Sequence, residues 1–352
     1  MKIKHKQYPQ TRVATIRCAI QSRSEIKAIL DDLAQKIPAD QIAGSPFCIF
    51  NFITSVADGS DVTVGYPVRG EIEGIKTEWL PEMDVLSIIH RGELEKLGET
   101  AGQVFAYGDQ HALMSDEFYR EVYLDETHPN GPGIEVHFII HNWNKKLAAN
   151  LERVLGPETR AAIMQGSERL EIETSIDERF QWVKEMLTRL NGVAGQAQKF
   201  DILSSCAHVF PQAQIDKLTA VFNEAKTRTG DFLQAVDAVI AFMDSDPGWG
   251  SGGTREGYTI YAVKRPRDPK AYAAAQTDLE RRQAYCFCPL VRTQMDQGMP
   301  SDFCNCSSGW FRQQWEGSLG QPVTVDVLKS VLQGDDKCEF AIHLPQDSSE
   351  VC

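Results

Sequence analysis

The stretch RVATIRCAIQSRSEIKAILDDLAQKI, residues 12–37, predicts a strand followed directly by a helix. Residues 12–20 are rich in β-branched and apolar side chains, which favours a strand. From Ile26 to Ile37 apolar side chains recur on one helical face, and Ser22 with Glu25 forms a capping-box pattern at the helix start. Residues 47–53 and 61–68 predict two further strands, so the order is strand, helix, strand, strand.

The same order appears a second time. Residues 84–92 predict a strand and residues 93–108 an amphipathic helix, with Gly108 in the position of a helix C-cap. Residues 117–124 and 133–140 then predict two strands joined by a turn-rich segment. A duplicated βαββ unit of this kind builds an antiparallel sheet with its helices on one face, and we expect a cleft between the two halves.

After Trp143 the pattern changes to helices, and the end of the chain is again rich in strand signals. A helix at residues 307–320, with Ser307 or Ser308 as its cap, precedes strand candidates at 322–327 and 337–344. We therefore predict an α+β protein of two domains. Residues 1–142 form the duplicated domain, and residues 143–352 form a helical and β domain that contains most of the cysteines.

Composition limits the classes of function. The net charge is −13 over 352 residues, which argues against a general phosphate-binding surface and hence against direct nucleic-acid binding. No apolar segment approaches the roughly 18 residues of a membrane span. Neither a signal peptide nor a membrane segment is indicated, so we expect a cytoplasmic protein. Nine cysteines indicate reduced thiols or metal ligands rather than a disulfide framework.

The strand at residues 117–124 carries an unusual polar group. Alternation places Tyr119, Glu121 and Tyr123 on one face and Val122 and Leu124 on the other. A carboxylate that is buried among apolar neighbours needs a hydrogen-bond donor or a cation. Glu121 therefore lies either in a pocket or on a solvated face with the tyrosines as ordinary cross-strand packing.

Residues 1–142 resemble the GyrI-like small-molecule-binding domain, also called the AraC-type effector-binding domain. The resemblance rests on the duplicated order, on LPEMDVLSIIHRGELEKL with His90 and Gly92, and on REVYL with Glu121. It implies that Glu121 sits in an aromatic-lined pocket between the halves and meets cationic ligands. In some stand-alone members, which resemble hydrolases of cyclopropane-bearing compounds, the same glutamate is implicated in catalysis.

Two functions follow for this domain. The first is binding of a hydrophobic, cationic small molecule, for sensing or sequestration, with ionised Glu121 as counter-charge and aromatic faces from Tyr119, Tyr123, Tyr66 and Trp79. The alternative is a hydrolase of ring-strained electrophiles, in which Glu121 activates a water and Tyr123 stabilises the leaving oxygen.

A third hypothesis concerns the second domain. Cys286 and Cys288, and Cys304 and Cys306, form two Cys-x-Cys pairs that predict a zinc site and a metal-dependent sensor or enzyme. Alternate residues of an extended chain lie about 6.6 Å apart, farther than sulfurs on one zinc ion, so buried reduced thiols are the alternative.

Residues 145–345 resemble a bacterial family of unsettled function and, through their closing Gly-Asp-x-x-Cys-x-Phe, 4-vinyl-reductase and aminothiazoline-carboxylate-hydrolase-like proteins.

Overall fold

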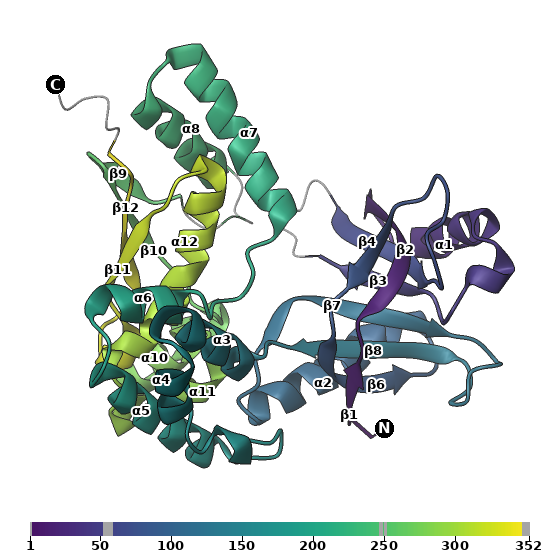
Figure 1. Ribbon diagram of the computed structural model, residues 1–352, viewed down its shortest axis with the longest axis horizontal. Coiled ribbons are helices and arrows are strands. Elements are labelled where there is room, and N and C mark those ends of the chain that lie inside the picture. Colours follow the sequence, from purple (N-terminus) through teal and green to yellow (C-terminus); the bar gives the residue numbers. More distant parts are fainter. Residues whose placement is uncertain (1, 52–58, 246–248, 250–251, 347–352) are drawn as a thin grey trace. The chain divides into compact units, whose positions relative to one another are not determined.

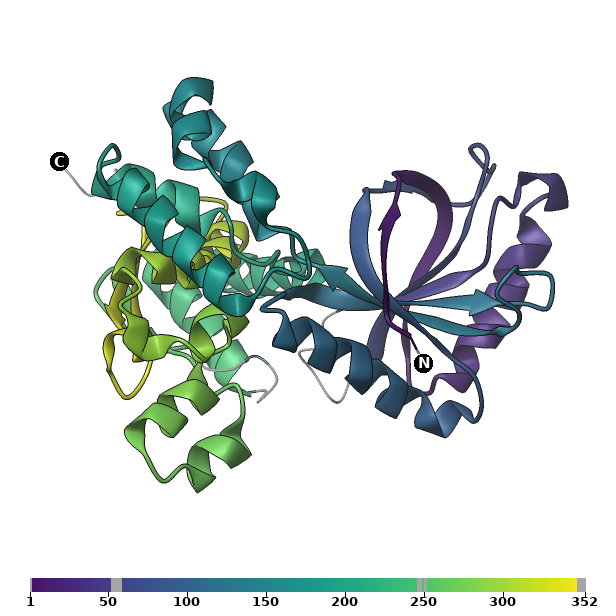
Figure 2. The same ribbon diagram turned by 90° about the horizontal axis from the view of Figure 1, so that it is seen from below.

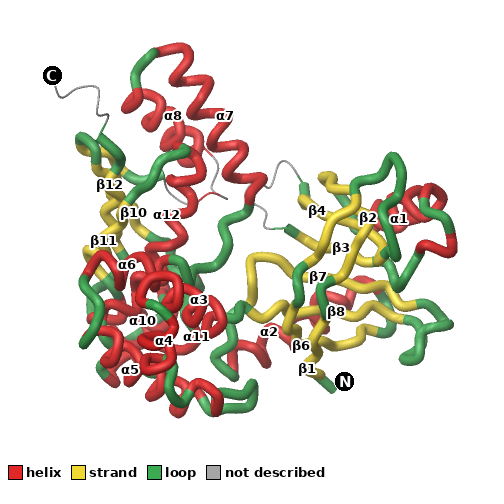
Figure 3. The backbone as a smooth tube through the Cα atoms, viewed as in Figure 1, coloured by secondary structure: helices red, strands yellow, loops and turns green. Residues whose placement is uncertain are grey.

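Figure 1 shows the computed structural model of the chain, which describes residues 2–51, 59–245, 249 and 252–346. The chain divides into two compact units, Met1–His141 and Asn142–Cys352. Strands dominate the first unit and helices the second, as the colours of Figure 3 show. The predicted α+β class, with a duplicated antiparallel domain followed by a helical and β part, is confirmed.

The first unit is built on one antiparallel sheet of eight strands in the order β1-β6-β8-β7-β3-β4-β2-β5. These strands are β1 (Lys4–Tyr8), β2 (Thr11–Ile20), β3 (Phe47–Phe50), β4 (Ser60–Pro67), β5 (Thr77–Leu80), β6 (Met83–His90), β7 (Ser115–Leu124) and β8 (Gly133–Ile140). The strand predicted at residues 47–53 is thus described to Phe50, and residues 52 and 53 lie outside the described part.

The duplication is visible in the strand order. One copy is β2, α1 (Ser24–Lys36), β3 and β4, and the other is β6, α2 (Leu97–Gln110), β7 and β8. Within the sheet, β6-β8-β7 is followed by β3-β4-β2, so the second copy continues the first in mirrored order. The copies meet at the pair β3 and β7, where Cys48 lies opposite Glu121.

Both helices cover the same face of this curled sheet (Figure 2). Ile26 and Leu30 of α1 are buried against this face, in a cluster that Tyr119 and Tyr123 of β7 also contact. Phe105 of α2 packs edge-on against Phe138 of β8, with ring centroids 5.2 Å apart. Glu121 therefore points to the side of the sheet on which the helices lie.

The C-cap predicted at Gly108 is wrong, because α2 continues through this residue to Gln110. Gly108 is buried where α2 lies closest to the sheet. A β-carbon at this position would lie 2.7 Å from Cζ of Phe138. The glycine is needed for close packing of the helix and not for its termination.

The second unit combines helices with a four-stranded antiparallel sheet of order β11-β12-β10-β9. Its elements are α3 (Trp143–Leu155), α4 (Pro157–Ile163), α5 (Ile176–Asn191), α6 (Gln196–Ser204), α7 (Gln212–Thr229), α8 (Phe232–Ser245), β9 (Thr254–Glu256), β10 (Thr259–Val263), α9 (Pro269–Ala274), α10 (Asp278–Tyr285), α11 (Pro289–Arg292), α12 (Asn305–Leu319), β11 (Thr324–Lys329) and β12 (Glu339–His343). None of the described helices combines the length and the hydropathy that a membrane span requires.

The core of this unit lies between α7, α8 and α12 and the small sheet. Trp315 of α12, which is 1% exposed, packs there with Phe340 and Ile342 of β12. The helix predicted at residues 307–320 begins earlier, at Asn305, with Cys304 as its N-cap residue. Ser308 is therefore inside the first turn, where its hydroxyl donates to the carbonyl of Asn305 at 2.7 Å.

Candidate functional site

Glu121 lies near the centre of the sheet and its side chain is 1% exposed. The hydroxyls of Tyr119 and Tyr123, two residues away on either side, each donate to it at 2.9 Å, Tyr119 to Oε1 and Tyr123 to Oε2. The period of the strand brings the three side chains to one face. The structure thus places the carboxylate inside the domain with a hydrogen-bond donor on each oxygen, as a buried charge requires.

A cation completes the surroundings of this carboxylate. Arg23, the residue just before α1, donates from Nη1 to Oε1 of Glu121 and from Nη2 to the hydroxyl of Tyr119. Its guanidinium carbon lies 4.4 Å from the centre of the Phe50 ring. The Phe50 ring is in turn stacked on Tyr119, with centroids 4.8 Å apart and an interplanar angle of 3°. The guanidinium is therefore held by a carboxylate and by an aromatic face.

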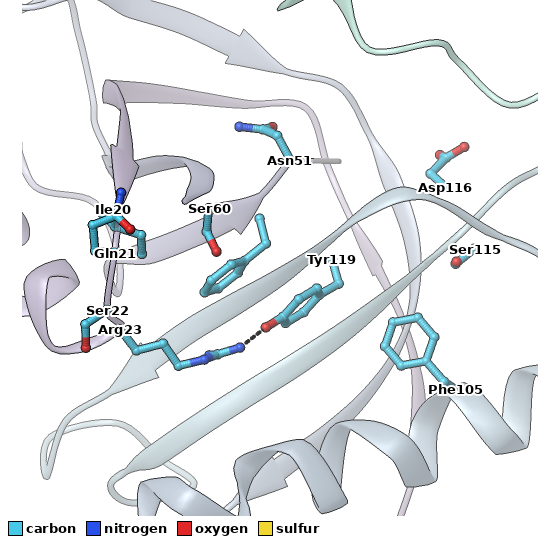
Figure 4. Close-up of a pocket in the computed structure, with 11 residues that line it drawn as sticks. Ile20, Gln21, Ser22, Arg23, Asn51, Ser60, Phe105, Ser115, Asp116 and Tyr119 are labelled. Carbon is cyan, nitrogen blue, oxygen red and sulfur yellow. Dashed lines mark hydrogen bonds between the residues drawn. The ribbon is translucent and has the colours of Figure 1, made fainter. Parts of the chain in front are cut away.

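A cavity of about 560 Å³ opens beside this group. Its lining comes from both copies of the duplicated unit: Ile20, Gln21, Ser22, Arg23, Phe50, Asn51 and Ser60 from the first, and Phe105, Ser115, Asp116 and Tyr119 from the second. In Figure 4 the guanidinium of Arg23 points to the Tyr119 hydroxyl, and Phe105 projects from the neighbouring helix. The volume falls within the range of sites for drug-sized ligands.

The electrostatics of the site follow from its burial. Desolvation and the neighbouring charge of Glu121 raise the pKa values of Tyr119 and Tyr123 well above the usual range, so both hydroxyls keep their protons and act as donors. Burial alone would lower the pKa of Arg23, but the hydrogen bond and charge of Glu121 outweigh it and raise this pKa. Arg23 therefore stays positively charged at neutral pH.

The other two aromatic candidates differ in their positions. Tyr66 of β4 is half-buried and packs against the same apolar cluster as Tyr119 and Tyr123, and also against the cluster that contains Leu33 of α1. Trp79 of β5 is 54% exposed, and the guanidinium carbon of Arg12 lies 4.9 Å from its ring. Of the five candidate residues only Tyr119 lines the cavity itself; Glu121 and Tyr123 lie behind Arg23 and Tyr119, and Tyr66 and Trp79 are not among the lining residues.

The geometry also bears on the hydrolase alternative. A general base needs an oxygen that can accept a proton from water. Arg23 and Tyr119 both donate to Oε1 of Glu121, and Tyr123 donates to Oε2. The side chain of Glu121 is 1% exposed, so a reacting water reaches the carboxylate only when a neighbouring donor moves aside, and Tyr123 is bonded to the base itself. Catalysis by Glu121 and Tyr123 stays a prediction.

A second buried polar cluster lies on the opposite face of the sheet. Arg120 donates from Nε to Nδ1 of His137 at 3.0 Å, and Nε2 of His137 lies 3.4 Å from the carboxylate of Glu135. Lys6 and Tyr8 of β1 also donate to Glu135. Burial lowers the pKa of His137 to about 4, so the ring is neutral at pH 7. This cluster ties the edge strand β1 to the sheet.

The cysteine pairs of the second unit lie at the ends of helices. Cys286 and Cys288 stand on the extended link between α10 and α11, with Phe287 between them 55% exposed. Cys304 and Cys306 are part of the start of α12, so this pair is helical and not extended. Cys304 Sγ lies 3.1 Å from the hydroxyl of Ser330.

A lysine that the sequence did not single out lies among these thiols. Nζ of Lys264 donates to the hydroxyl of Ser307 at 2.7 Å and lies 5.8 Å from the centre of the Phe287 ring. Burial lowers the pKa of Lys264, and a thiolate at a surrounding cysteine, Cys338 first among them, would oppose this. Burial also raises the pKa values of Cys304 and Cys306 to about 12, which keeps both thiols protonated.

The positions of the sulfurs decide whether these thiols fit a metal ion. In the described part of the chain, which includes both pairs and Cys338, no three cysteine sulfurs lie within 4.8 Å of one another. Sulfurs on one zinc ion are closer than this, at about 3.8 Å. The thiols as placed do not fit a zinc ion, and the zinc site stays a prediction that requires the side chains to move.

No known protein-family profile matches the sequence, and no curated protein matches it. Solved structures resemble about two fifths of the chain. The EcmrR C-terminal domain has 17% identity, covers 40% of this chain and 96% of its own, and has a TM-score of 0.35. SAV2435 bound to tetraphenylphosphonium has 14% identity over 41% and 97%, with a TM-score of 0.31. A hydrolase from Listeria innocua has 8% identity over 40% and 91%, with a TM-score of 0.29.

Proposed function

We propose that the first unit binds a hydrophobic, cationic small molecule in the cavity beside Glu121. One observation carries this proposal. The site already holds a guanidinium between a buried carboxylate and an aromatic ring, and it does so at the wall of a cavity large enough for a ligand. A group that combines positive charge with a flat, weakly hydrated surface satisfies both partners at once.

The surroundings suit the rest of such a ligand. Phe50, Phe105 and Tyr119 offer ring surface to the cavity, and aromatic lining with a few polar groups is typical of small-molecule sites. Ser60 and Ser115 supply hydroxyls, and Asp116 supplies a second carboxylate at the opposite side from Arg23. The lining thus combines aromatic surface with polar side chains, and Glu121 lies behind Arg23 and Tyr119.

The test compares two dyes of the same shape. Thioflavin T is a flat monocation, and its benzothiazole analogue without the ring N-methyl group is uncharged. We expect calorimetric titration of the full chain to show preferential binding of the cation, and we expect Glu121→Gln to weaken it by about tenfold or more, because the buried counter-charge is lost. Glu78→Gln, which removes a carboxylate of β5 outside the cavity lining, serves as the matched control.

Equal affinity of the two dyes for the native chain, or cation binding that Glu121→Gln leaves unchanged, contradicts the proposal. The same titrations test the hydrolase alternative when a cyclopropane-bearing electrophile replaces the dye and product is followed by mass spectrometry. Turnover that Glu121→Gln abolishes while the fold is intact would favour that alternative.

A further inference from the structure

Arg23 occupies the position that the cation of a ligand would need. Its guanidinium bonds Glu121 and Tyr119 and stacks over Phe50, and each of these is a contact that the proposed function assigns to the ligand. One cation neutralises the carboxylate, and a second cation beside it would leave a net positive charge and be repelled by the first. A cationic ligand and Arg23 therefore compete for Glu121.

The two partners of this ion pair differ in their freedom to move. Glu121 lies on a central strand and its side chain is 1% exposed, whereas the side chain of Arg23 is 38% exposed and lines the cavity. Arg23 belongs to the link between β2 and α1 and precedes the first helical residue. Its long side chain can therefore turn into water, where a guanidinium is solvated, while Glu121 stays in place.

We propose that Arg23 is an internal competitor that a cationic ligand must displace from Glu121 and Phe50. This inference rests on the proposed function. It makes Arg23 the residue that sets ligand selectivity. A ligand enters the site only when its own cation replaces the guanidinium between the carboxylate and the ring.

The same geometry defines the class of ligand. A compact ammonium ion is strongly hydrated and has no flat face for Phe50, so it replaces a guanidinium poorly. Amidinium ions and N-alkylated heteroaromatic cations spread their charge over a plane and stack as Arg23 does. The competition thus selects flat, delocalised monocations with attached aromatic surface. It excludes simple amines, and neutral aromatics gain nothing from Glu121.

The size of the effect follows from linkage. The ligand binds only molecules in which Arg23 has turned away from Glu121, which we call the open state. The apparent dissociation constant of the ligand is therefore the intrinsic one divided by the fraction of molecules in the open state. In the closed state Arg23 is paired with Glu121. For a charge-assisted pair that is partly exposed, the closed state outweighs the open state by roughly nine to one. Removal of the competitor is therefore expected to tighten binding of the cation by about tenfold.

The experiment removes the guanidinium and keeps the carboxylate. We expect Arg23→Gln to tighten binding of thioflavin T by about tenfold and to leave its uncharged analogue unchanged. Arg23→Lys keeps a charge but loses the flat fork, so its affinity should fall between those of Arg23→Gln and the native chain. Arg12→Gln is the matched control, because Arg12 also stacks on a ring, that of Trp79, outside the cavity lining.

Three outcomes overturn the inference. If thioflavin T binds Arg23→Gln no more tightly than the native chain, Arg23 does not compete. If Arg23→Lys binds the dye more weakly than the native chain, the guanidinium assists binding. If the anion anilinonaphthalene sulfonate binds the native chain and loses affinity in Arg23→Gln, Arg23 is itself a ligand contact.

Failure of the proposed function gives a different result. In that case neither the native chain nor any Arg23 variant prefers thioflavin T over its uncharged analogue. A preference that Glu121→Gln abolishes in the native chain, with no gain in Arg23→Gln, leaves the proposed function in place and removes only the competition.

Discussion

Replacement of Tyr123 by phenylalanine tests how the buried carboxylate is held. The two oxygens of Glu121 differ in their donors. Among the described residues Tyr123 is the one donor to Oε2, whereas Oε1 accepts from both Tyr119 and Arg23. Tyr123→Phe keeps the ring and its packing and removes only the hydroxyl. It therefore leaves Oε2 buried without a partner.

The expected cost can be worked from these contacts. Loss of a hydrogen bond to a buried charged group costs about 1.5–3 kcal/mol of the free energy of unfolding. Tyr119→Phe removes a hydroxyl that donates to Oε1 at the same 2.9 Å and also accepts from Nη2 of Arg23. Oε1 keeps its own bond to Arg23, and the guanidinium, whose side chain is 38% exposed, can bond water in place of the lost hydroxyl. Its cost should be only about 0.5–1.5 kcal/mol, the net value of an ordinary hydrogen bond.

The measurement must report the first unit by itself, because unfolding of a chain with two units is not a single transition. Of the six tryptophans, Trp79 alone lies in Met1–His141. Fluorine NMR of the fluorotryptophan-labelled chain in urea therefore follows the sheet through one resonance. If Tyr119→Phe costs as much as Tyr123→Phe, or more, the assignment of donors to the two oxygens is wrong.

Three further predictions use the same resonance or the thiols. The free energy of unfolding should fall as the pH falls from 6.5 to about 4, because the unfolded chain takes up a proton on His137 in this window while the folded chain, whose His137 pKa is lowered to about 4, does not. The loss is on the order of 3 kcal/mol, and His137→Gln should flatten the slope; an unchanged slope contradicts the assignment. Gly108→Ala should destabilise the unit by about 1–3 kcal/mol, because its β-carbon would overlap a phenylalanine ring. Gly102→Ala on the same helix meets nothing within 4 Å and should stabilise it by about 0.5–1 kcal/mol; similar effects of both would refute the packing argument. Iodoacetamide should label Cys304 and Cys306 slowly at pH 8 and faster at higher pH, because burial raises both pKa values to about 12. One equivalent of zinc should protect both Cys-x-Cys pairs together if they form the predicted metal site, and unchanged labelling by mass spectrometry speaks against that site.

The fold followed from periodicity because each element of the duplicated unit is amphipathic over its own length. Side chains of a strand alternate between its two faces with a period of two. The eight residues 117–124 were therefore enough to predict that Tyr119, Glu121 and Tyr123 share a face. The role of Gly108 could not be predicted in this way. Glycine as a C-cap and glycine as a close-packing residue look the same in a sequence, and the ring of Phe138 that distinguishes them is 30 residues away.

The charge partner of Glu121 escaped prediction for a similar reason. Arg23 stands 98 residues from Glu121 in the chain, within a capping-box sequence where an arginine is unremarkable. Its one sequence signal is position, since it directly precedes a helix that the duplicated order places over the sheet. Lys264 gave no signal at all, because the thiols around it come from segments that meet only in the folded chain.

Cys48 and Glu121 lie opposite each other on the strand pair where the two copies meet. The buried anion belongs to the second copy, whereas the residue that neutralises it, Arg23, directly precedes the helix of the first copy. Exchange of the two residues, Cys48→Glu with Glu121→Cys, would place anion and cation in the same copy. The ion pair of the native chain thus acts as a cross-link between the two copies of the duplicated unit.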